Sequence, residues 1–251
     1  MRILIVNDDG INAEGIKAMA RALALTHEHE IFVVAPHTQQ SGMAQALTMG
    51  VALKVKNETI LPDDLPVKAY SVEGTPADCT KLALEILLKD IDLVISGIND
   101  GTNLGTDVLY SGTVGAALEA YVHNVPSLAV SVGTKSTISF DQIAQVIADN
   151  LNYLCSTGKL FMYNINFPNK LKDDKVKFVF TKQGYRFYKN EFDIVNMPDG
   201  SVAYRMQGRA QDLNNDEQSD IVAFNKGYVS ITPLCLERTD FVQLNQLKDL
   251  N

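Results

Sequence analysis

The chain opens with four apolar side chains that give way abruptly to polar ones. Residues 3–6 are Ile, Leu, Ile and Val, and Asn7, Asp8, Asp9 and Gly10 follow directly. An unbroken apolar run of this length is typical of a strand buried on both faces of a parallel sheet. The polar residues would then lie at the carboxyl end of that strand, where open α/β sheets bind their ligands.

The same alternation of apolar strands and amphipathic helices continues along most of the chain. Apolar residues recur at helical spacing over residues 12–27, and a second buried strand is predicted at residues 30–36. Thr75 and Pro76 are typical of a helix start, with Thr75 as the cap. Further strands are predicted at residues 92–99, 126–132 and 162–167 and twice within 51–72, and further helices at residues 75–89, at 140–155 and before residue 123. This pattern predicts an α/β fold with a doubly wound, mostly parallel, Rossmann-like sheet.

The pattern changes after residue 176, where alternating and aromatic-rich segments replace the helices. A turn signal, Pro198-Asp199-Gly200, separates an aromatic-rich segment at 184–195 from a short alternating one at 201–206. We therefore predict a protruding antiparallel β-hairpin at the C-terminal end of the sheet. A polar loop at 211–220 and a last strand at 227–233 are predicted to follow it.

Aromatic side chains of the predicted hairpin would leave apolar surface exposed. They are Tyr185, Phe187, Tyr188 and Phe192. A partner subunit could cover this surface, or the rings could pack on the chain's own sheet, and the pattern leaves both alternatives open. We predict a single domain over residues 1–251, in which the hairpin region at about 183–220 serves oligomerisation.

The composition narrows the functions to consider. Of the 251 residues, 46% are hydrophobic and 21% are charged, and the formal net charge is -8. Such a chain is not expected to wrap polymeric nucleic acid or to lie on an anionic membrane, although a small anion could bind in a local pocket. No apolar run approaches the ~18 residues that span a membrane, and no signal segment precedes the first strand. Because Cys79, Cys155 and Cys235 are widely spaced, reduced thiols and a cytoplasmic location are expected.

Oxygen donors follow three of the predicted strands. Asp8 and Asp9 follow the first strand, Ser41 follows the second, and Asn99 ends the strand at 92–99. Two adjacent carboxylates repel each other unless a cation lies between them, and hard oxygen donors suit Mg²⁺ or Mn²⁺ better than zinc or copper. The alternative is an ordinary turn, because Asp-Gly is common turn chemistry and Asp is a common helix cap.

A second polar segment precedes the helix that ends near residue 123. Ser111, Gly112 and Thr113 would offer hydroxyl groups, free backbone N–H groups and a positive helix end to an anion. The alternative is a closely packed helix start that Ser111 or Thr113 caps. Histidine forms no cluster, and only His37 lies near the predicted site. The signatures of P-loop NTPases, dinucleotide-binding proteins and α/β-hydrolases are all missing from the sequence.

Short motifs at the ends of the predicted elements carry the strongest functional signal. In chain order they are residues 3–10, Val34-Ala35-Pro36, Ser41-Gly42, Leu47-Thr48, residues 73–79, Ser96-Gly97-Ile98-Asn99, Gly101, Asn103-Leu104-Gly105, residues 110–114, residues 126–131, residues 164–168 and residues 230–234. In this order, and over nearly the whole chain, they resemble the SurE (survival protein E) family of metal-dependent nucleoside monophosphate phosphatases.

The resemblance implies a site and a reaction. It implies that one divalent cation per subunit, Mg²⁺ or Mn²⁺, is held by Asp8, Asp9, Ser41 and Asn99. It also implies removal of phosphate from nucleoside 5′- and 3′-monophosphates and, in some members, from short polyphosphate. On this resemblance we assign Asp8 and Asp9 as the catalytic residues. We assign the substrate and phosphate contacts to Asn7, Gly10, Gly42, Asn103, Ser111, Gly112 and Thr113. A homodimer or homotetramer that packs or exchanges the hairpin region is implied as well.

The chain departs from the family pattern in the loop after the second strand. The family commonly has an acidic and then a basic residue after Pro36, whereas this chain has His37 and Thr38. It also has Met43-Ala44-Gln45 where small or polar residues are usual. The base and sugar preference is therefore left open. Two other functions are also left open: a non-catalytic nucleotide-sensing module, and a hydrolase that acts mainly on sugar phosphates or polyphosphate.

Overall fold

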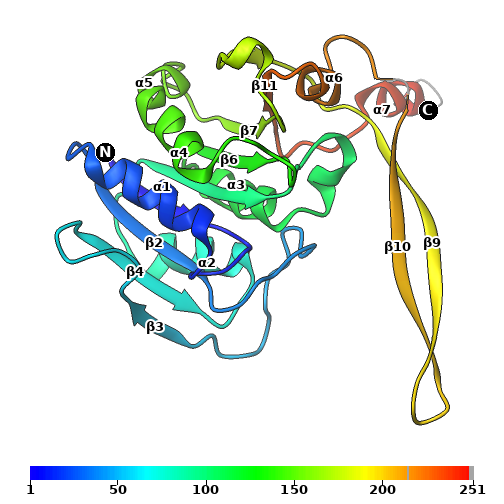
Figure 1. Ribbon diagram of the computed structural model, residues 1–251, viewed down its shortest axis with the longest axis horizontal. Coiled ribbons are helices and arrows are strands. Elements are labelled where there is room, and N and C mark those ends of the chain that lie inside the picture. Colours follow the sequence, from blue (N-terminus) through cyan, green and yellow to red (C-terminus); the bar gives the residue numbers. More distant parts are fainter. Residues whose placement is uncertain (214, 249–251) are drawn as a thin grey trace.

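A computed structural model describes residues 1–213 and 215–248, and a nine-stranded sheet runs through its centre (Figure 1). The strand order is β3-β4-β2-β1-β5-β6-β7-β11-β8. The strands are β1 (Arg2–Val6), β2 (Glu30–Pro36), β3 (Val55–Glu58), β4 (Val67–Val72), β5 (Leu93–Asp100), β6 (Ser127–Val132), β7 (Met162–Phe167), β8 (Phe178–Phe180) and β11 (Val229–Pro233). Only the β3–β4 and β7–β11 pairs of this sheet are antiparallel. The predicted doubly wound, mostly parallel sheet is confirmed.

The order of the strands reverses at β1. Strands β2 and β4 follow β1 on one side, whereas β5, β6 and β7 follow it on the other. The connections after β1 and β5 therefore leave the sheet in different directions and open a crevice at the carboxyl ends of these strands. The Asp8-Asp9 turn and Asn99 lie at this switch point because they follow β1 and end β5.

Helices cover both faces of the sheet, which explains why the first apolar run is unbroken. Ile3 and Ile5 pack in one core with α1 (Glu14–Leu25) and α4 (Phe140–Asp149). Leu4 and Val6 point to the opposite face and pack in a second core with α2 (Pro76–Leu82) and α3 (Gly112–Val122). All four of these β1 side chains are fully buried. A strand with a core on each face has no solvent side that would accept a polar residue.

Two predicted helices differ from expectation in their C-terminal halves. Thr75 caps α2 as predicted, in a capping box with Asp78, but the helix passes into a single π-helical turn at Ala83–Leu87. The helix predicted at 140–155 is divided at Asn150 into α4 and α5 (Leu151–Leu154). The Asn150 side chain donates to the Val146 carbonyl oxygen, so it competes with the backbone hydrogen bonds that would continue the helix.

The predicted hairpin is present, and its strands extend beyond the apolar segments that predict them. Strands β9 (Arg186–Asn196) and β10 (Val202–Asp212) form a separate two-stranded antiparallel sheet that projects from the body (Figure 1). Strand β10 extends to Asp212, into the segment predicted as a loop, because backbone pairing with β9 continues past the last apolar residue. Two short helices, α6 (Asp220–Asn225) and α7 (Phe241–Lys248), were not predicted.

Two further properties concern the thiols and the hydropathy of the helices. The thiols of Cys79, Cys155 and Cys235 are all free, as expected. Among the described residues, no helix has the length and apolar character needed to cross a membrane.

Candidate metal and phosphate site

The connections after β1, β2 and β5 meet around a cavity of about 760 Å³ at the switch point. The cavity is lined by Asp8, Asp9, Gln39, Ser41, Gly42, Asn99, Asp100, Thr102, Asn103, Thr106, Asp107, Leu109, Tyr110, Ser111, Tyr185, Arg186, Phe187, Tyr188 and Met206. All four oxygen donors assigned to the cation are in this set. The fold therefore brings together four donors that span 91 residues of the sequence, from Asp8 to Asn99.

Asp8 is the most buried carboxylate of this cavity, at 5% exposure. The Thr113 hydroxyl donates a hydrogen bond to its Oδ1 atom at 2.5 Å. Burial is the main cause that raises the pKa of Asp8 from 3.8 to about 6, and the charge of Asp9 adds to it, while the bond from Thr113 opposes the shift. A carboxylate with a raised pKa gains stability when a cation binds beside it.

Asp9 is half-buried and joins three connections. Its Oδ1 atom accepts a hydrogen bond from Gln39 Nε2, and its Oδ2 atom accepts one from the backbone N–H of Asp100, both at 3.3 Å. Burial raises the pKa of Asp9 above its usual value. The turn after β1 is thus tied to the loop after β2 and to the end of β5.

Asn99 is turned into the cavity by an irregularity in β5. The β5–β6 register shifts between Gly97 and Asn99, and such a bulge changes the direction of the following side chains. The Asn99 amide nitrogen donates to the Gly101 carbonyl oxygen at 2.7 Å. Because the nitrogen is engaged, the oxygen of the same amide is the atom that can serve a ligand.

Ser41 and Gly42 form an exposed turn after β2. The backbone on either side of this turn is anchored: Gln40 N–H donates to the Asp8 carbonyl oxygen at 2.7 Å, and Ala44 N–H donates to that of Tyr110 at 2.9 Å. An exposed turn held at both ends can present a hydroxyl group to a ligand without large rearrangement.

Asn7 and Gly10 are occupied within the turn and do not line the cavity. Asn7 is fully buried, and its side-chain amide donates to the Gly10 carbonyl oxygen at 2.9 Å and accepts from the Gly10 N–H at 3.1 Å. Gly10 has a φ of +98°, a conformation that favours glycine. The geometry therefore gives both residues a role in shaping the Asp8-Asp9 turn, and the substrate contact assigned to them from the sequence stays a prediction.

The start of α3 has a capped end that borders the cavity. Ser111 is the N-cap, because its Oγ atom accepts from the Val114 N–H at 3.1 Å, and it also lines the cavity. Thr113 is fully buried and uses its hydroxyl on Asp8, so it does not face the cavity. A Cβ atom on Gly112 would lie 2.9 Å from Asp8 Cβ and 3.2 Å from the Gln40 carbonyl oxygen. Only glycine allows the helix end to approach Asp8 this closely.

Asn103 is fixed by asparagines of β7. Its Nδ2 atom donates to Ser131 Oγ and its backbone N–H donates to Asn166 Oδ1, both at 2.8 Å. Its carbonyl oxygen accepts from Asn164 Nδ2 at 2.7 Å and from Asn166 Nδ2 at 3.2 Å. These bonds give the motif at 164–168 a structural function, which is to hold the loop that carries Asn103.

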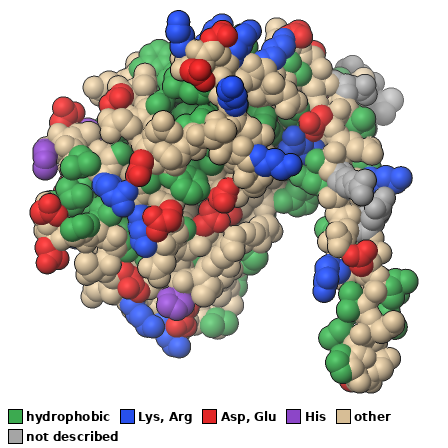
Figure 2. Space-filling view, viewed as in Figure 1, with side chains coloured by type: hydrophobic (Ala, Val, Ile, Leu, Met, Phe, Trp, Pro, Cys, Tyr) green, Lys and Arg blue, Asp and Glu red, His purple; other side chains and the backbone are tan. Residues whose placement is uncertain are grey.

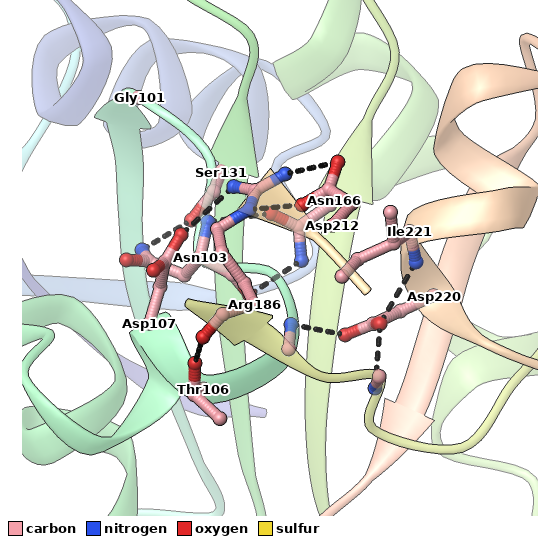
Figure 3. Close-up of polar contacts among 12 residues, drawn as sticks. Gly101, Asn103, Thr106, Asp107, Ser131, Asn166, Arg186, Asp212, Asp220 and Ile221 are labelled. Carbon is pink, nitrogen blue, oxygen red and sulfur yellow. Dashed lines mark hydrogen bonds and ion pairs between the residues drawn. The ribbon is translucent and has the colours of Figure 1, made fainter. Parts of the chain in front are cut away.

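His37 lies outside the cavity that contains the carboxylates. It is exposed and lines a separate, smaller cavity with Thr75 and Gly74. Several residues that do line the main cavity were missed by the sequence interpretation, among them Gln39, Asp107 and Arg186. Figure 3 shows Arg186 lying between Asp107 and Asp212. No local pattern marks these residues, because the contacts that bring them here join distant segments.

The donor set fits a hard divalent cation. Within the described part of the chain, no three His, Cys, Asp or Glu side chains gather as a metal cluster. The donors assigned to the cation are instead the carboxylates of Asp8 and Asp9, the Ser41 hydroxyl and the Asn99 amide oxygen, which all line the cavity. This set suits Mg²⁺ or Mn²⁺, which keep part of their water shell, and it lacks the nitrogen and sulfur ligands that zinc prefers.

Comparisons with known proteins agree along the whole chain. The family model described as Survival protein SurE matches residues 3–190. A protein of Alkaliphilus metalliredigens named 5'-nucleotidase SurE is 42% identical over 259 residues, which cover 100% of this chain and 99% of that one. A Clostridium botulinum protein of the same name is 39% identical, with 100% and 99% covered. The crystal structure of the SurE protein from Aquifex aeolicus superposes with a TM-score of 0.80 at 36% identity, covering 100% of this chain and 99% of that chain.

Proposed function

This chain belongs to the Survival protein SurE family and is a 5'-nucleotidase, and we propose that it hydrolyses nucleoside monophosphates with a divalent cation bound in the cavity. The proposed products are a nucleoside and inorganic phosphate. The proposal extends to 3′-monophosphates and to short polyphosphate as further substrates. The observation that carries it is the convergence of Asp8, Asp9, Ser41 and Asn99 on one cavity beside the start of α3.

The charge of the cavity supports the dependence on a cation. Its lining includes four carboxylates, Asp8, Asp9, Asp100 and Asp107, and a single basic side chain, Arg186. Arg186 is already paired with Asp107 and Asp212. A phosphate dianion would be repelled by this lining. A bound divalent cation would offset the repulsion, coordinate the phosphate and lower the pKa of an attacking water.

The chain's own groups then have distinct tasks. Asp8 and Asp9 supply the negative charge that holds the cation, and they are the nearest groups that could accept a proton. Ser111, which lines the cavity, and the N-terminal end of α3 would stabilise the negative charge that develops on the phosphate oxygens. The bond from Thr113 and the close approach of Gly112 keep Asp8 next to this helix end.

A phosphate-release assay tests the proposal. We expect Mn²⁺-dependent release from AMP and from a 3′-nucleotide, a loss of roughly 100-fold or more in EDTA, and recovery when Mn²⁺ is added back. Sugar phosphate and polyphosphate are assayed in parallel. Absence of release from every substrate would favour the nucleotide-sensing module. Preferred release from sugar phosphate or polyphosphate would favour a hydrolase that acts mainly on those substrates. Release that is unchanged in EDTA would contradict the role of the cation.

The hairpin supports a proposal about assembly. Residues directly opposite in an antiparallel pair share a face, so Phe192 and Met206 lie beside Ile194 and Tyr204. Each of these four side chains is at least 51% exposed. Figure 2 shows hydrophobic side chains gathered towards the far end of the projecting hairpin. We propose that a second copy of the chain covers the part of this apolar face that lies outside the cavity, at Phe192, Ile194 and Tyr204, giving a homodimer or homotetramer.

The mass in solution tests the assembly. Replacing Ile194 by Asp places a charge in the apolar face, and we expect it to lower the mass measured by light scattering, because burying an unpaired carboxylate opposes association. Gln207→Asp is the matched control, because Gln207 is exposed on the opposite face of the same hairpin. A wild-type protein that stays monomeric at high concentration would contradict the proposal.

A further inference from the structure

The hairpin builds one side of the cavity. Besides Arg186, four residues of this segment line the cavity, Tyr185, Phe187, Tyr188 and Met206, which we call the hairpin wall. In the described part of the chain, β9 and β10 pair only with each other, so no hydrogen-bond ladder of the main sheet fixes this wall. Side-chain contacts at the base of the hairpin must hold it against the body.

Arg186 makes the central contact of this kind. Its Nη1 atom lies 2.9 Å from Asp107 Oδ2, in the 3₁₀ turn η2 (Gly105–Leu109) of the body. Its Nε and Nη2 atoms lie 2.7 Å and 3.3 Å from the two carboxylate oxygens of Asp212, its direct partner on β10. One guanidinium group therefore ties both hairpin strands to the turn (Figure 3). The side chains of Arg186 and Asp107 are only 12% and 13% exposed, so water screens this pair little.

The charge balance indicates a positioning role for Arg186. Two carboxylates already surround its single positive charge, so it has no unmatched charge to offer to a phosphate. A fork that binds three oxygens in fixed geometry is instead suited to hold segments in register.

Two further side chains, those of Asp220 and Thr106, tie the base of the hairpin to the turn η2. The fully buried Asp220 accepts hydrogen bonds from the backbone N–H groups of Gly105 at 2.9 Å and of Gly184 at 2.8 Å. These groups belong to the start of η2 and to the residue just before the hairpin wall. The Thr106 hydroxyl also donates to the Arg186 carbonyl oxygen.

The turn held by Arg186 leads directly to the phosphate end of the cavity. The Asp107 carbonyl oxygen accepts from the N–H groups of Tyr110 at 2.9 Å and of Ser111 at 3.1 Å. Asp107 thus contacts the hairpin through its side chain and the cap of α3 through its backbone. The position of Asp107 therefore sets the distance between the hairpin wall and Ser111, the cap of α3.

We propose that Arg186 is a positioning residue for substrate specificity: by tying the hairpin to Asp107, it holds the hairpin wall where the nucleoside half of the substrate stacks. The inference rests on the proposed function and assigns the two halves of the substrate to two parts of the chain. The aromatic rings of Tyr185, Phe187 and Tyr188 provide a flat apolar surface on which a base can stack. A base forms few hydrogen bonds with such a surface. The body holds the phosphate.

Separate binding measurements of adenosine and of inorganic phosphate test this division. By calorimetry in the presence of Mn²⁺, we expect Arg186→Met to weaken adenosine binding about tenfold or more, comparable to the loss of one base stack. Phosphate binding is expected to change less than about threefold, because the body site is intact. Arg186→Lys keeps the charge without the fork and is expected to fall between Arg186→Met and the wild type.

Two more variants keep the test decisive if Arg186→Met does not fold. Phe187→Ala removes part of the wall with the tie in place, and Asp107→Asn weakens the tie from the body side, so both should weaken adenosine binding more than phosphate binding. Arg21→Met is the matched control, because it removes the ion pair between Arg21 on α1 and Asp141 on α4, which lies outside the cavity.

The outcomes separate this inference from the proposed function. Equal weakening of adenosine and phosphate, or unchanged adenosine binding in the folded variants, would overturn the role of Arg186. A wild-type protein that does not bind adenosine would overturn it as well. Phosphate release from AMP by the wild type is measured independently. The proposed nucleotidase activity can therefore be supported even if the proposed role of the hairpin wall is contradicted.

Discussion

Replacing Asp8 by Asn is expected to lower phosphate release from AMP by well over 100-fold at saturating Mn²⁺. Loss of a group that merely supports a metal ligand already costs about 10- to 100-fold, so loss of a charged ligand should cost more. Asn keeps the size of the side chain and can still accept the Thr113 hydrogen bond, so the geometry of the turn should survive. Steady-state kinetics across a Mn²⁺ titration measure the effect.

The same variant should be more stable than the wild type once the cation is removed. The pKa of Asp8 is raised from 3.8 to about 6, so the folded state binds more protons than the unfolded state between these values. The ionised carboxylate therefore destabilises the fold above about pH 6, and this penalty disappears as the pH falls toward 4. In EDTA at pH 7.5 we expect the free energy of unfolding of Asp8→Asn, measured by urea titration, to exceed that of the wild type by about 3 kcal/mol, with no difference near pH 4.

These two readouts distinguish loss of a ligand from loss of the fold. Asp149→Asn on α4 is the control, because this exposed carboxylate lies outside the cavity and should leave both quantities unchanged. Near-wild-type turnover of Asp8→Asn at saturating Mn²⁺ would mean that Asp8 is not a ligand. Lower stability of this variant at pH 7.5 in EDTA would contradict the raised pKa.

Replacing Gly112 by Ala is expected to lower activity by roughly 100-fold, the scale of loss that follows a displacement of about 1 Å at a reacting centre. The added methyl group would lie 2.9 Å from Asp8 Cβ and 3.2 Å from the Gln40 carbonyl oxygen. Asp8 is buried and the Gln40 carbonyl belongs to the backbone, so neither can give way easily. The helix end and the carboxylate must separate, which disturbs the phosphate and cation contacts together. The Mn²⁺ affinity and kcat for AMP should fall in parallel.

Gly158→Ala serves as the comparison for this substitution. Gly158 has a φ of +60° and no atom within 4 Å of an added Cβ, and it lies outside the cavity. Alanine there should reduce stability by about 1 kcal/mol through backbone strain alone and leave kcat unchanged. Unchanged kcat in Gly112→Ala would show that the helix start tolerates a side chain beside Asp8.

Local patterns were sufficient for most of the fold. The unbroken apolar runs at β1, β2 and β5 predict strands covered on both faces, and their order with the intervening helices predicts the doubly wound sheet. Thr75 and Pro76 predict the start of α2 because capping depends on neighbouring residues. The division at Asn150 and the short helices α6 and α7 were missed, since they depend on side-chain competition or on few residues.

The sequence located the candidate site but did not show which of its residues line the cavity. Asp8, Asp9, Ser41 and Asn99 follow or end strands, so strand positions alone place them at one edge of the sheet. Asn7 and Gly10 lie in the same segment, yet their hydrogen bonds turn them toward each other and away from the cavity. Proximity in sequence therefore locates a site but does not say which neighbouring side chains face it.

The sequence by itself determined which residue types reach the carboxyl ends of the strands, and with them an oxygen-rich, acidic site. Only the tertiary structure decided how that site is held and bounded. Thr113 bonds to Asp8 across 105 residues, and Arg186 meets Asp107 across 79. Local periodicity reports how a segment buries its own side chains, whereas such contacts depend on the packing of complete layers, which no single segment encodes.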